Sequence, residues 1–347
     1  MTSSISSSDL PGFSAPKRVI LLTLAFFMMT SGAVMAVNAW IDPFDSAISP
    51  VRKQIDRLDE FRTKNVAQWA AFDIHDLPAA AFENAQVVLV GDSRTRLLSG
   101  GYERSRAYVF EGKHVLDLSF GGAAINESLD VFRRHRKQLK SVEMVVFGIS
   151  YDQLNDKYNK RDRYGRALRY ANHPWLYLLN FETLERSAPY VFRNPDRPQN
   201  SGGAPAARPE RLGEATIKCN QSLPPLPPNF PAGNEQVKRN TNLPWPDAHR
   251  VFERLVAPEL KELDQAGIQH VIFIPPNSPR LEAFLQAGMR LQLDLYARKA
   301  ASVSRVVRLP PEALKGAVWR DDWHVCSDSG DYLLDQIWRR LYEDDGL

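Results

Sequence analysis

A short apolar strand that ends in a serine places the strongest constraint on how this chain can fold. Val87 to Val90 is a continuous run of β-branched and aliphatic residues, typical of a strand buried on both faces of a parallel sheet. Gly91 ends the run, and Asp92 and Ser93 stand where the strand gives way to a predicted helix. A serine at this junction lies at the carboxyl edge of the sheet, where open α/β folds bind ligands. The pattern therefore predicts an α/β domain with a candidate site at Ser93.

The rest of the chain continues the alternation of strands and helices. Further strands are predicted at about 114–118, 142–149, 269–274 and 302–308, and helices at about 126–139, 247–266, 280–299 and 330–341. Strands that alternate with helices are joined by right-handed crossovers into a parallel sheet covered on both faces. We therefore expect a three-layer α/β/α sandwich with a mostly parallel, flavodoxin-like sheet, preceded by one transmembrane helix.

The N-terminal part of the chain predicts that membrane anchor. Lys17 and Arg18 precede an uncharged apolar run over residues 19–41, which is long enough to cross a bilayer. Because the nearby positive charges lie before the run, the positive-inside rule places residues 1–18 in the cytoplasm. The rest of the chain would then be periplasmic or extracytoplasmic, held at the inner or plasma membrane. A cleaved signal peptide is the alternative, since Val37-Asn-Ala39 fits a cleavage site, but the apolar run exceeds the usual hydrophobic region of such peptides.

Two further regions differ from the alternating pattern. Residues 42–84 carry apolar positions at steps of three and four residues, which predicts an amphipathic link between the anchor and the domain. Residues from about 194 to 246 are rich in proline, glycine and serine and have little apolar periodicity. We interpret this stretch as a long surface insertion within a single domain over residues 85–347.

The composition argues against several classes of function. A formal net charge of +3 is too small to indicate a nucleic-acid partner, and no basic stripe is interleaved with aromatic residues. The two cysteines, Cys219 and Cys326, have no metal-ligand spacing, although they could form a single bridge outside the cytoplasm. The histidines other than His324 lack partners at ligand spacing, so we expect neither a metal site nor a cofactor.

A second motif, near the C-terminus, supplies what a nucleophilic serine requires. In Asp321-Asp-Trp-His324 a carboxylate stands one turn from an imidazole, so that both can reach one site from one loop. The imidazole takes the hydroxyl proton, and the acid holds the imidazole tautomer and stabilises the imidazolium. Asp322 is the alternative acid, although the spacing favours Asp321.

Together these motifs resemble the SGNH (GDSL-type) hydrolase superfamily. The resemblance is carried by Gly91-Asp92-Ser93 after a buried strand, by the glycine-bearing loop over residues 119–124, and by Asp321-x-x-His324. It covers about residues 85–150 and 268–343. It implies that Ser93 is the nucleophile, Asp321 the orienting acid and His324 the base.

The resemblance also implies an oxyanion hole. The backbone N–H groups of Ser93 and of Gly121 or Gly122 are its candidate donors. The third block of the family usually reads Gly-x-Asn-Asp, with the asparagine donating to the oxyanion, whereas here the third strand ends Gly148-Ile-Ser-Tyr-Asp. Ser150 is the candidate substitute. A missing donor typically costs about 3 kcal/mol of transition-state stabilisation.

Polar and aromatic residues at the predicted sheet edge are candidate substrate contacts: Arg94, Tyr151, Asn277 and Trp323. Arg94 and Arg96 also fall in the first turn of a predicted helix, where cations oppose the macrodipole. Such a placement indicates pairing with a carboxylate, for which Asp117 or Glu127 is a candidate, or contact with an anionic glycan.

The anchor and the Gly-Asp-Ser-Arg-Thr variant further resemble membrane-anchored envelope proteins of the superfamily, such as the alginate-type polysaccharide O-acetyltransferases. This resemblance implies an enzyme that acetylates an envelope or secreted polysaccharide through an acyl-Ser93 intermediate. The expected partners are a glycan acceptor, an acyl donor and a membrane protein that exports acyl groups. A carbohydrate or lipid esterase is the first alternative, because transfer and hydrolysis share every catalytic residue. A non-catalytic glycan-binding scaffold is the second, and the incomplete third block supports it.

Overall fold

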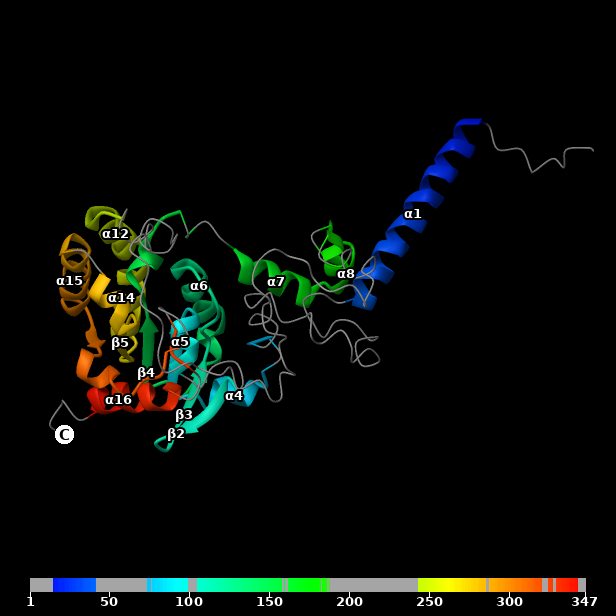
Figure 1. Ribbon diagram of the computed structural model, residues 1–347. Helices are drawn as coiled ribbons and strands as arrows, with labels where there is room; N and C mark the ends of the chain where they lie inside the picture. Colours follow the sequence, from blue (N-terminus) through cyan, green and yellow to red (C-terminus); the bar gives the residue numbers. More distant parts are fainter. Residues whose placement is uncertain are drawn as a thin grey trace, which may run out of the picture. The chain divides into compact units, whose positions relative to one another are not determined.

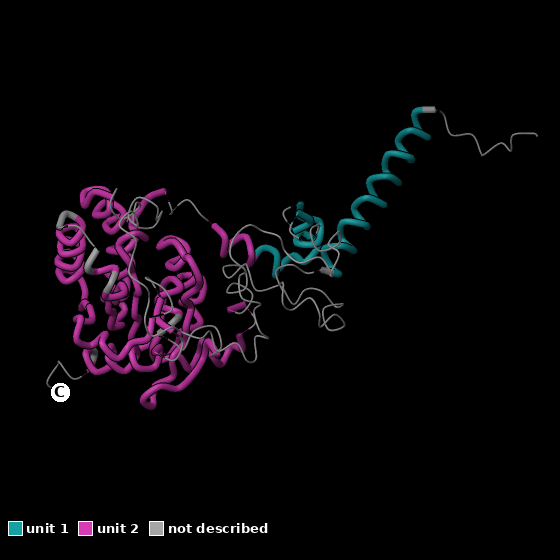
Figure 2. Tube along the Cα trace, in the orientation of Figure 1, with its two compact units in different colours: residues 1–63, 169–206 teal, residues 64–168, 207–347 magenta. Residues whose placement is uncertain are grey.

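The computed structural model describes residues 15–41, 74–98, 105–187 and 243–342, apart from positions 76, 158, 160, 161, 182, 186, 285, 286, 320–323, 327 and 328. The chain divides into two compact units, coloured separately in Figure 2: residues 1–63 with 169–206, and residues 64–168 with 207–347. This division groups residues 169–206 with the N-terminal part of the chain rather than with the rest of the predicted domain. Most of the predicted link, residues 42–73, and most of the predicted insertion, residues 194–242, lie outside the described residues.

The second unit is built on a mixed, mostly parallel six-stranded sheet in the order β2-β3-β1-β4-β5-β6 (Figure 1). The strands are β1 (Val87–Gly91), β2 (Ala107–Phe110), β3 (Lys113–Asp117), β4 (Met144–Gly148), β5 (Gln269–Ile274) and β6 (Arg305–Arg308). Only β2 runs antiparallel to its neighbour among these strands. The α/β prediction is therefore confirmed, and five of the six strands follow the predicted positions. The strand β2 was not predicted from the sequence. It is a four-residue edge strand, and a tight turn at Glu111 and Gly112, both with positive φ, joins it to β3.

Helices occur along the chain before, between and after these strands. They are α4 (Ala79–Glu83), α5 (Ser93–Leu98), α6 (Ile125–His135), α7 (Arg163–Asn172), α12 (Trp245–Val251), α13 (Ala257–Gln265), α14 (Pro279–Phe284), α15 (Ala287–Ala301) and α16 (Gly330–Tyr342). Of these helices, α7 includes residues of both units. A π-helical turn over Phe252–Val256 joins α12 to α13, so the predicted helix over 247–266 is present with one wide turn. The helix predicted over 280–299 corresponds to α14 and α15, which flank residues 285 and 286, two positions outside the described residues.

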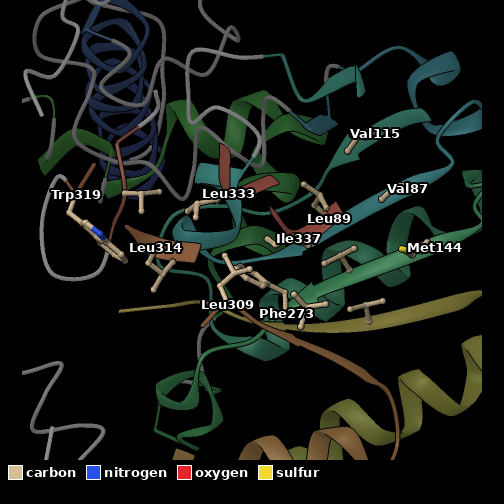
Figure 3. Close-up of a cluster of buried hydrophobic side chains, with 14 residues drawn as sticks. Val87, Leu89, Val115, Met144, Phe273, Leu309, Leu314, Trp319, Leu333 and Ile337 are labelled. Carbon is tan, nitrogen blue, oxygen red and sulfur yellow. The ribbon is translucent and has the colours of Figure 1, made fainter. Parts of the chain in front are cut away.

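The strands are buried on both faces, as their composition predicts. All residues of β1 and β4 are buried. Alternate residues such as Leu89 and Val146 form one apolar cluster with Leu333 and Ile337 of α16 (Figure 3). Phe147 follows Val146 and so points to the opposite face. Burying one such aliphatic or aromatic side chain contributes about 1.5–3 kcal/mol, so these two faces supply much of the folding energy of the second unit.

The strand order creates the place where a site can form. β1 pairs with β3 on one side and with β4 on the other, both in parallel. After β1 the chain forms β2 and β3 on one side of that strand, and it then forms β4, β5 and β6 on the other side. The strand order therefore reverses direction at β1. In open α/β sheets, ligands bind outside the carboxyl ends of the strands at such a switch point. Ser93 follows β1 and stands there.

The first unit contains α1 (Ala15–Ile41) and α8 (Pro174–Leu178). Residues Pro16–Trp40 form the one helix, within the described ranges, that is long and apolar enough to cross a membrane. The predicted transmembrane run is therefore a continuous helix of suitable length and composition.

A buried ion pair ties the start of α5 to the end of β3. Arg96 Nη1 lies 2.9 Å from Asp117 Oδ2, and the two side chains are 2% and 0% exposed. The other oxygen, Asp117 Oδ1, accepts a hydrogen bond from the backbone N–H of Ser119 at 2.8 Å. The predicted pairing of an α5 arginine with Asp117 is therefore present. Glu127, the other candidate, pairs with Arg163 instead.

We expect Asp117→Ala to lower the free energy of unfolding by about 3–5 kcal/mol, because the buried Arg96 guanidinium loses the carboxylate that faces it. Urea denaturation of the full chain in detergent, followed by circular dichroism, measures the change as a shifted midpoint at constant slope. Asp130→Ala is the matched control, since it removes an exposed ion pair with Arg134. That control should cost less than about 1 kcal/mol. Equal losses in the two variants would contradict the role assigned to the buried pair.

Candidate active site

The structure brings a serine and a histidine from distant motifs into contact at the carboxyl edge of the sheet. Ser93 is the first residue of α5, and its Oγ lies 2.9 Å from Nε2 of His324, 231 positions away in the sequence. His324 precedes Val325, which forms an isolated antiparallel bridge with Trp319. The distance is that of a hydrogen bond between a nucleophilic hydroxyl and its general base. Such a pair can activate the serine for attack on a carbonyl carbon.

Two glycines determine where α5 begins and hence where Ser93 lies. Gly91 and Gly148 are aligned neighbours at the ends of β1 and β4. A Cβ atom on Gly148 would lie 1.9 Å from Thr95 Oγ1, and one on Gly91 would lie 2.1 Å from the same atom. The first turn of α5 therefore packs directly on the backbone of two strands. The sequence pattern identifies Gly91 as the end of a strand, whereas its further role in seating Thr95 depends on a glycine at the same position of the adjacent strand.

The two chain neighbours of Ser93, Asp92 and Arg94, are buried charged residues. Asp92 Oδ1 accepts a hydrogen bond from the backbone N–H of Arg94 at 2.9 Å, a local turn interaction typical of aspartate. Arg94 Nη2 lies 3.2 Å from Asp92 Oδ2 and 2.8 Å from Asp152 Oδ1. Burial lowers the pKa of Arg94, but the two carboxylates outweigh it and hold this pKa above its ordinary value. Arg94 is thus a buried, permanently charged group between two carboxylates, which favours the pairing alternative over contact with an anionic glycan.

The loop after β3 carries the glycines predicted to complete an oxyanion hole. Because β3 is adjacent to β1, the turn at Gly121 and Gly122 follows a strand end next to that of Ser93. Gly122 has φ +63, and its carbonyl oxygen accepts a hydrogen bond from the Arg163 guanidinium. Arg163 also forms an ion pair with the buried Glu127 at 2.8 Å. Arg163 was not predicted from the sequence, and its contacts restrain the turn.

Ser150, the predicted substitute for the missing asparagine, is engaged within its own turn. Its backbone N–H and its hydroxyl lie 2.8 Å and 3.1 Å from Gln153 Oε1. Gln153 Nε2 in turn donates to the carbonyl of Ala123 at 3.0 Å and so joins this turn to the loop after β3. Both donors of Ser150 therefore have a local acceptor, and the two other predicted positions, at Ser93 and the glycine turn, remain the candidates for oxyanion donors.

The residues predicted to contact substrate mostly form hydrogen bonds within the protein. Tyr151 is buried, with its hydroxyl 2.8 Å from the carbonyl of Leu243 and 3.2 Å from Gln292 Oε1. Burial raises the pKa of Tyr151, so the hydroxyl keeps its proton and acts as a donor. The buried Asn277 follows β5, and its Nδ2 donates to Glu282 Oε1 at 2.7 Å. Trp323 lies outside the described residues, as do Asp321 and Asp322, so the choice of orienting acid stays a prediction.

A disulfide lies close to the candidate base. Cys326, two positions after His324, is buried and disulfide-bonded. The sequence contains one other cysteine, Cys219, which lies outside the described residues. The bond restrains the segment that carries His324. Among the residues that the structure describes, no group of three or more His, Cys, Asp or Glu side chains could hold a metal ion.

Comparison of the chain with models of protein families, with characterised proteins and with solved structures finds no match.

We expect Gly148→Ala to destabilise the protein by about 1–3 kcal/mol, because the added methyl group overlaps Thr95 at the start of α5. The same change made in a Thr95→Ala background should cost about half as much or less, since the closest contacting atoms are then absent. A double-mutant cycle from urea denaturation midpoints measures this coupling. Additive effects of the two substitutions would show that Thr95 does not rest on Gly148 as described.

Proposed function

We propose that this protein is a serine-dependent acyltransferase or esterase of the SGNH (GDSL-type) superfamily. The observation that carries the proposal is the 2.9 Å contact between Ser93 Oγ and His324 Nε2. These residues come from two motifs that were singled out for complementary chemical roles, and they meet although most of the domain separates them in sequence. A serine used only as a helix cap would not need a histidine at this distance.

The fold supports the same proposal. Without the edge strand β2, the parallel strands run β3-β1-β4-β5-β6, which is the order of a flavodoxin-like doubly wound sheet. Val146 packs in the cluster with α16, while Phe147 makes an edge-to-face contact with Phe132 of α6 at 5.8 Å between ring centroids. Consecutive residues of β4 thus contact helices on opposite faces of the sheet, as a three-layer α/β/α sandwich requires.

In the proposed first step, Ser93 Oγ attacks the carbonyl carbon of an acyl ester while His324 Nε2 accepts the hydroxyl proton. The negative charge on the carbonyl oxygen would be stabilised by the backbone N–H of Ser93 and one from the turn at Gly121 and Gly122. The C–O bond to the leaving alcohol then breaks, and the alcohol takes the proton from His324. The product is an acyl ester of Ser93.

In the second step, an acceptor hydroxyl attacks the acyl carbon and gives its proton to His324. The bond to Ser93 Oγ breaks, and the serine recovers the proton. A sugar hydroxyl as acceptor gives O-acylation, and water gives ester hydrolysis. The same residues serve both outcomes, so the acceptor that enters the site decides between transferase and esterase.

The proposed location is the outer side of the inner or plasma membrane, with α1 as an uncleaved anchor. The length of α1 and the position of Lys17 and Arg18 before its apolar part support this orientation. The disulfide at Cys326 also supports it, because disulfides persist in oxidising compartments and are rare in the cytosol. A catalytic domain tethered there is suited to acetylating an envelope or secreted polysaccharide, with an exporting membrane protein as the source of acyl groups.

One observation favours a second candidate, a non-catalytic glycan-binding scaffold. Ser150 directs both of its donors to Gln153, so the block that usually completes the oxyanion hole contributes no donor from this residue. Loss of one oxyanion donor typically costs about 3 kcal/mol, which slows a reaction but does not abolish it. We therefore retain the enzyme as the proposal and expect modest turnover.

The proposal is tested by turnover of p-nitrophenyl acetate by the full chain in detergent, with and without an oligosaccharide acceptor. We expect Ser93→Ala and His324→Ala each to lower kcat/KM by at least about 10³-fold, because nucleophile and base act as a unit. His249→Ala, a partly exposed histidine of α12, is the matched control and should leave the rate unchanged. Mass analysis of the sugar distinguishes transfer from hydrolysis. If the wild-type rate equals that of both site variants and a fluorophosphonate probe leaves Ser93 unlabelled, the scaffold replaces the enzyme.

The orienting acid is tested by comparing Asp321→Asn with Asp322→Asn in the same assay. We expect Asp321→Asn to lower kcat by about 10²–10⁴-fold, because the amide no longer stabilises the imidazolium form of His324. Asp322→Asn should change kcat by less than about threefold, as expected for an exposed loop charge. The reverse order would assign the acid to Asp322.

A further inference from the structure

Within the first unit, a short segment packs against the C-terminal end of α1. Asn38 of α1 is fully buried, and its Nδ2 donates to the carbonyl oxygens of Leu178 at 2.7 Å and Asn180 at 3.3 Å. Its Oδ1 accepts the hydroxyl of Ser187 at 3.1 Å. An asparagine in an apolar helix is costly unless its polar atoms are paired. The segment that begins with α8 provides those partners, so it is held at a defined height on α1.

That height corresponds to the edge of the hydrocarbon layer. The apolar part of α1 begins at Val19, after Lys17 and Arg18, and about 20 residues bring the helix to Asn38. With a rise of 1.5 Å per residue, this stretch covers about 30 Å, the thickness of the hydrocarbon core. The residues that bind Asn38 therefore lie where acyl chains give way to headgroups.

The outward side of the segment is apolar and aromatic. Tyr177 is fully buried and packs on Tyr170, with 5.9 Å between the ring centroids. The residues around it point outward, with Trp175 56%, Leu179 40% and Phe181 76% exposed. Three exposed apolar side chains within one seven-residue stretch make this segment a candidate interaction surface. Trp40, near the end of α1, is 47% exposed in the same unit.

We infer that residues 174–181 form a membrane-contacting surface that inserts Trp175, Leu179 and Phe181 into the outer interface of the bilayer crossed by α1. The lipid-exposed face of α1 supplies the continuity, because Asn38 joins the two elements where the membrane helix leaves the hydrocarbon. Tryptophan suits this depth, since its large apolar ring and its polar N–H prefer the interface. The inference rests on the proposed anchoring by α1 and is independent of the acyl chemistry.

The test measures quenching of tryptophan fluorescence by lipids. The full chain is reconstituted into phosphatidylcholine vesicles containing lipids brominated near the headgroup end of the acyl chains, and the wild type is compared with Trp175→Phe. We expect this variant to lose about half of the lipid-quenched emission, because, of the tryptophans in the described residues, Trp40 and Trp175 would be the two at the interface. Trp319→Phe, in the core of the second unit, is the control and should leave the lipid-quenched emission unchanged.

Trp40→Phe separates the inference from the anchoring on which it rests. If Trp40→Phe lowers the lipid-quenched emission and Trp175→Phe does not, the anchor stands and the membrane-contacting surface is refuted. If neither variant lowers it, both the anchor and the surface are refuted. A Leu179→Gln/Phe181→Gln variant provides a second readout. It should reduce quenching of Trp175 and leave that of Trp40 unchanged, and equal quenching of Trp175 with and without these changes would overturn the inference.

Discussion

The central position of β1 is the constraint on which the rest of the second unit depends. Because β1 pairs in parallel with β3 and β4, the chain segments after all three strands emerge at one edge of the sheet. Parallel pairing also requires crossovers that place apolar helices against the sheet, which explains why every residue of β1 is buried. A serine placed directly after such a strand is held by a rigid scaffold and is supplied with neighbours from distant parts of the chain.

The start of α5 combines close packing with buried charge. Thr95 rests on the backbone of two paired strands, and the arginines on either side of it are each compensated by carboxylates. Buried ion pairs contribute little net stability, because desolvation offsets most of their attraction, but breaking one is costly. Such pairs therefore restrict the positions that α5 can take.

In the second unit, the polar groups that sequence patterns suggested for ligands are largely satisfied within the protein. Arg94 is held by two carboxylates and Ser150 by Gln153. Unpaired buried polar groups are costly, so neighbouring backbone and side chains take up most of their hydrogen-bonding capacity. Ser93 and His324 differ from these residues, because their shared hydrogen bond would join the proposed nucleophile to the proposed base.

The sequence by itself determined the local features of this protein. The apolar run before Gly91 identifies a strand buried on both faces, and residues 19–41 identify a helix of membrane-spanning length, because composition and periodicity are local properties. The edge strand β2 escaped detection, since a short edge strand is only partly buried and carries little of that signal.

Only the tertiary structure decided which side chains meet. Ser93 contacts a residue 231 positions away, and Arg94 contacts Asp152, 58 positions away. Both contacts follow from the order of strands in the sheet, which brings the ends of distant segments together and is encoded in no single stretch of sequence. The motifs therefore predicted Ser93 and His324 as candidate residues. The packing of β1 between its neighbouring strands placed the two side chains at hydrogen-bonding distance.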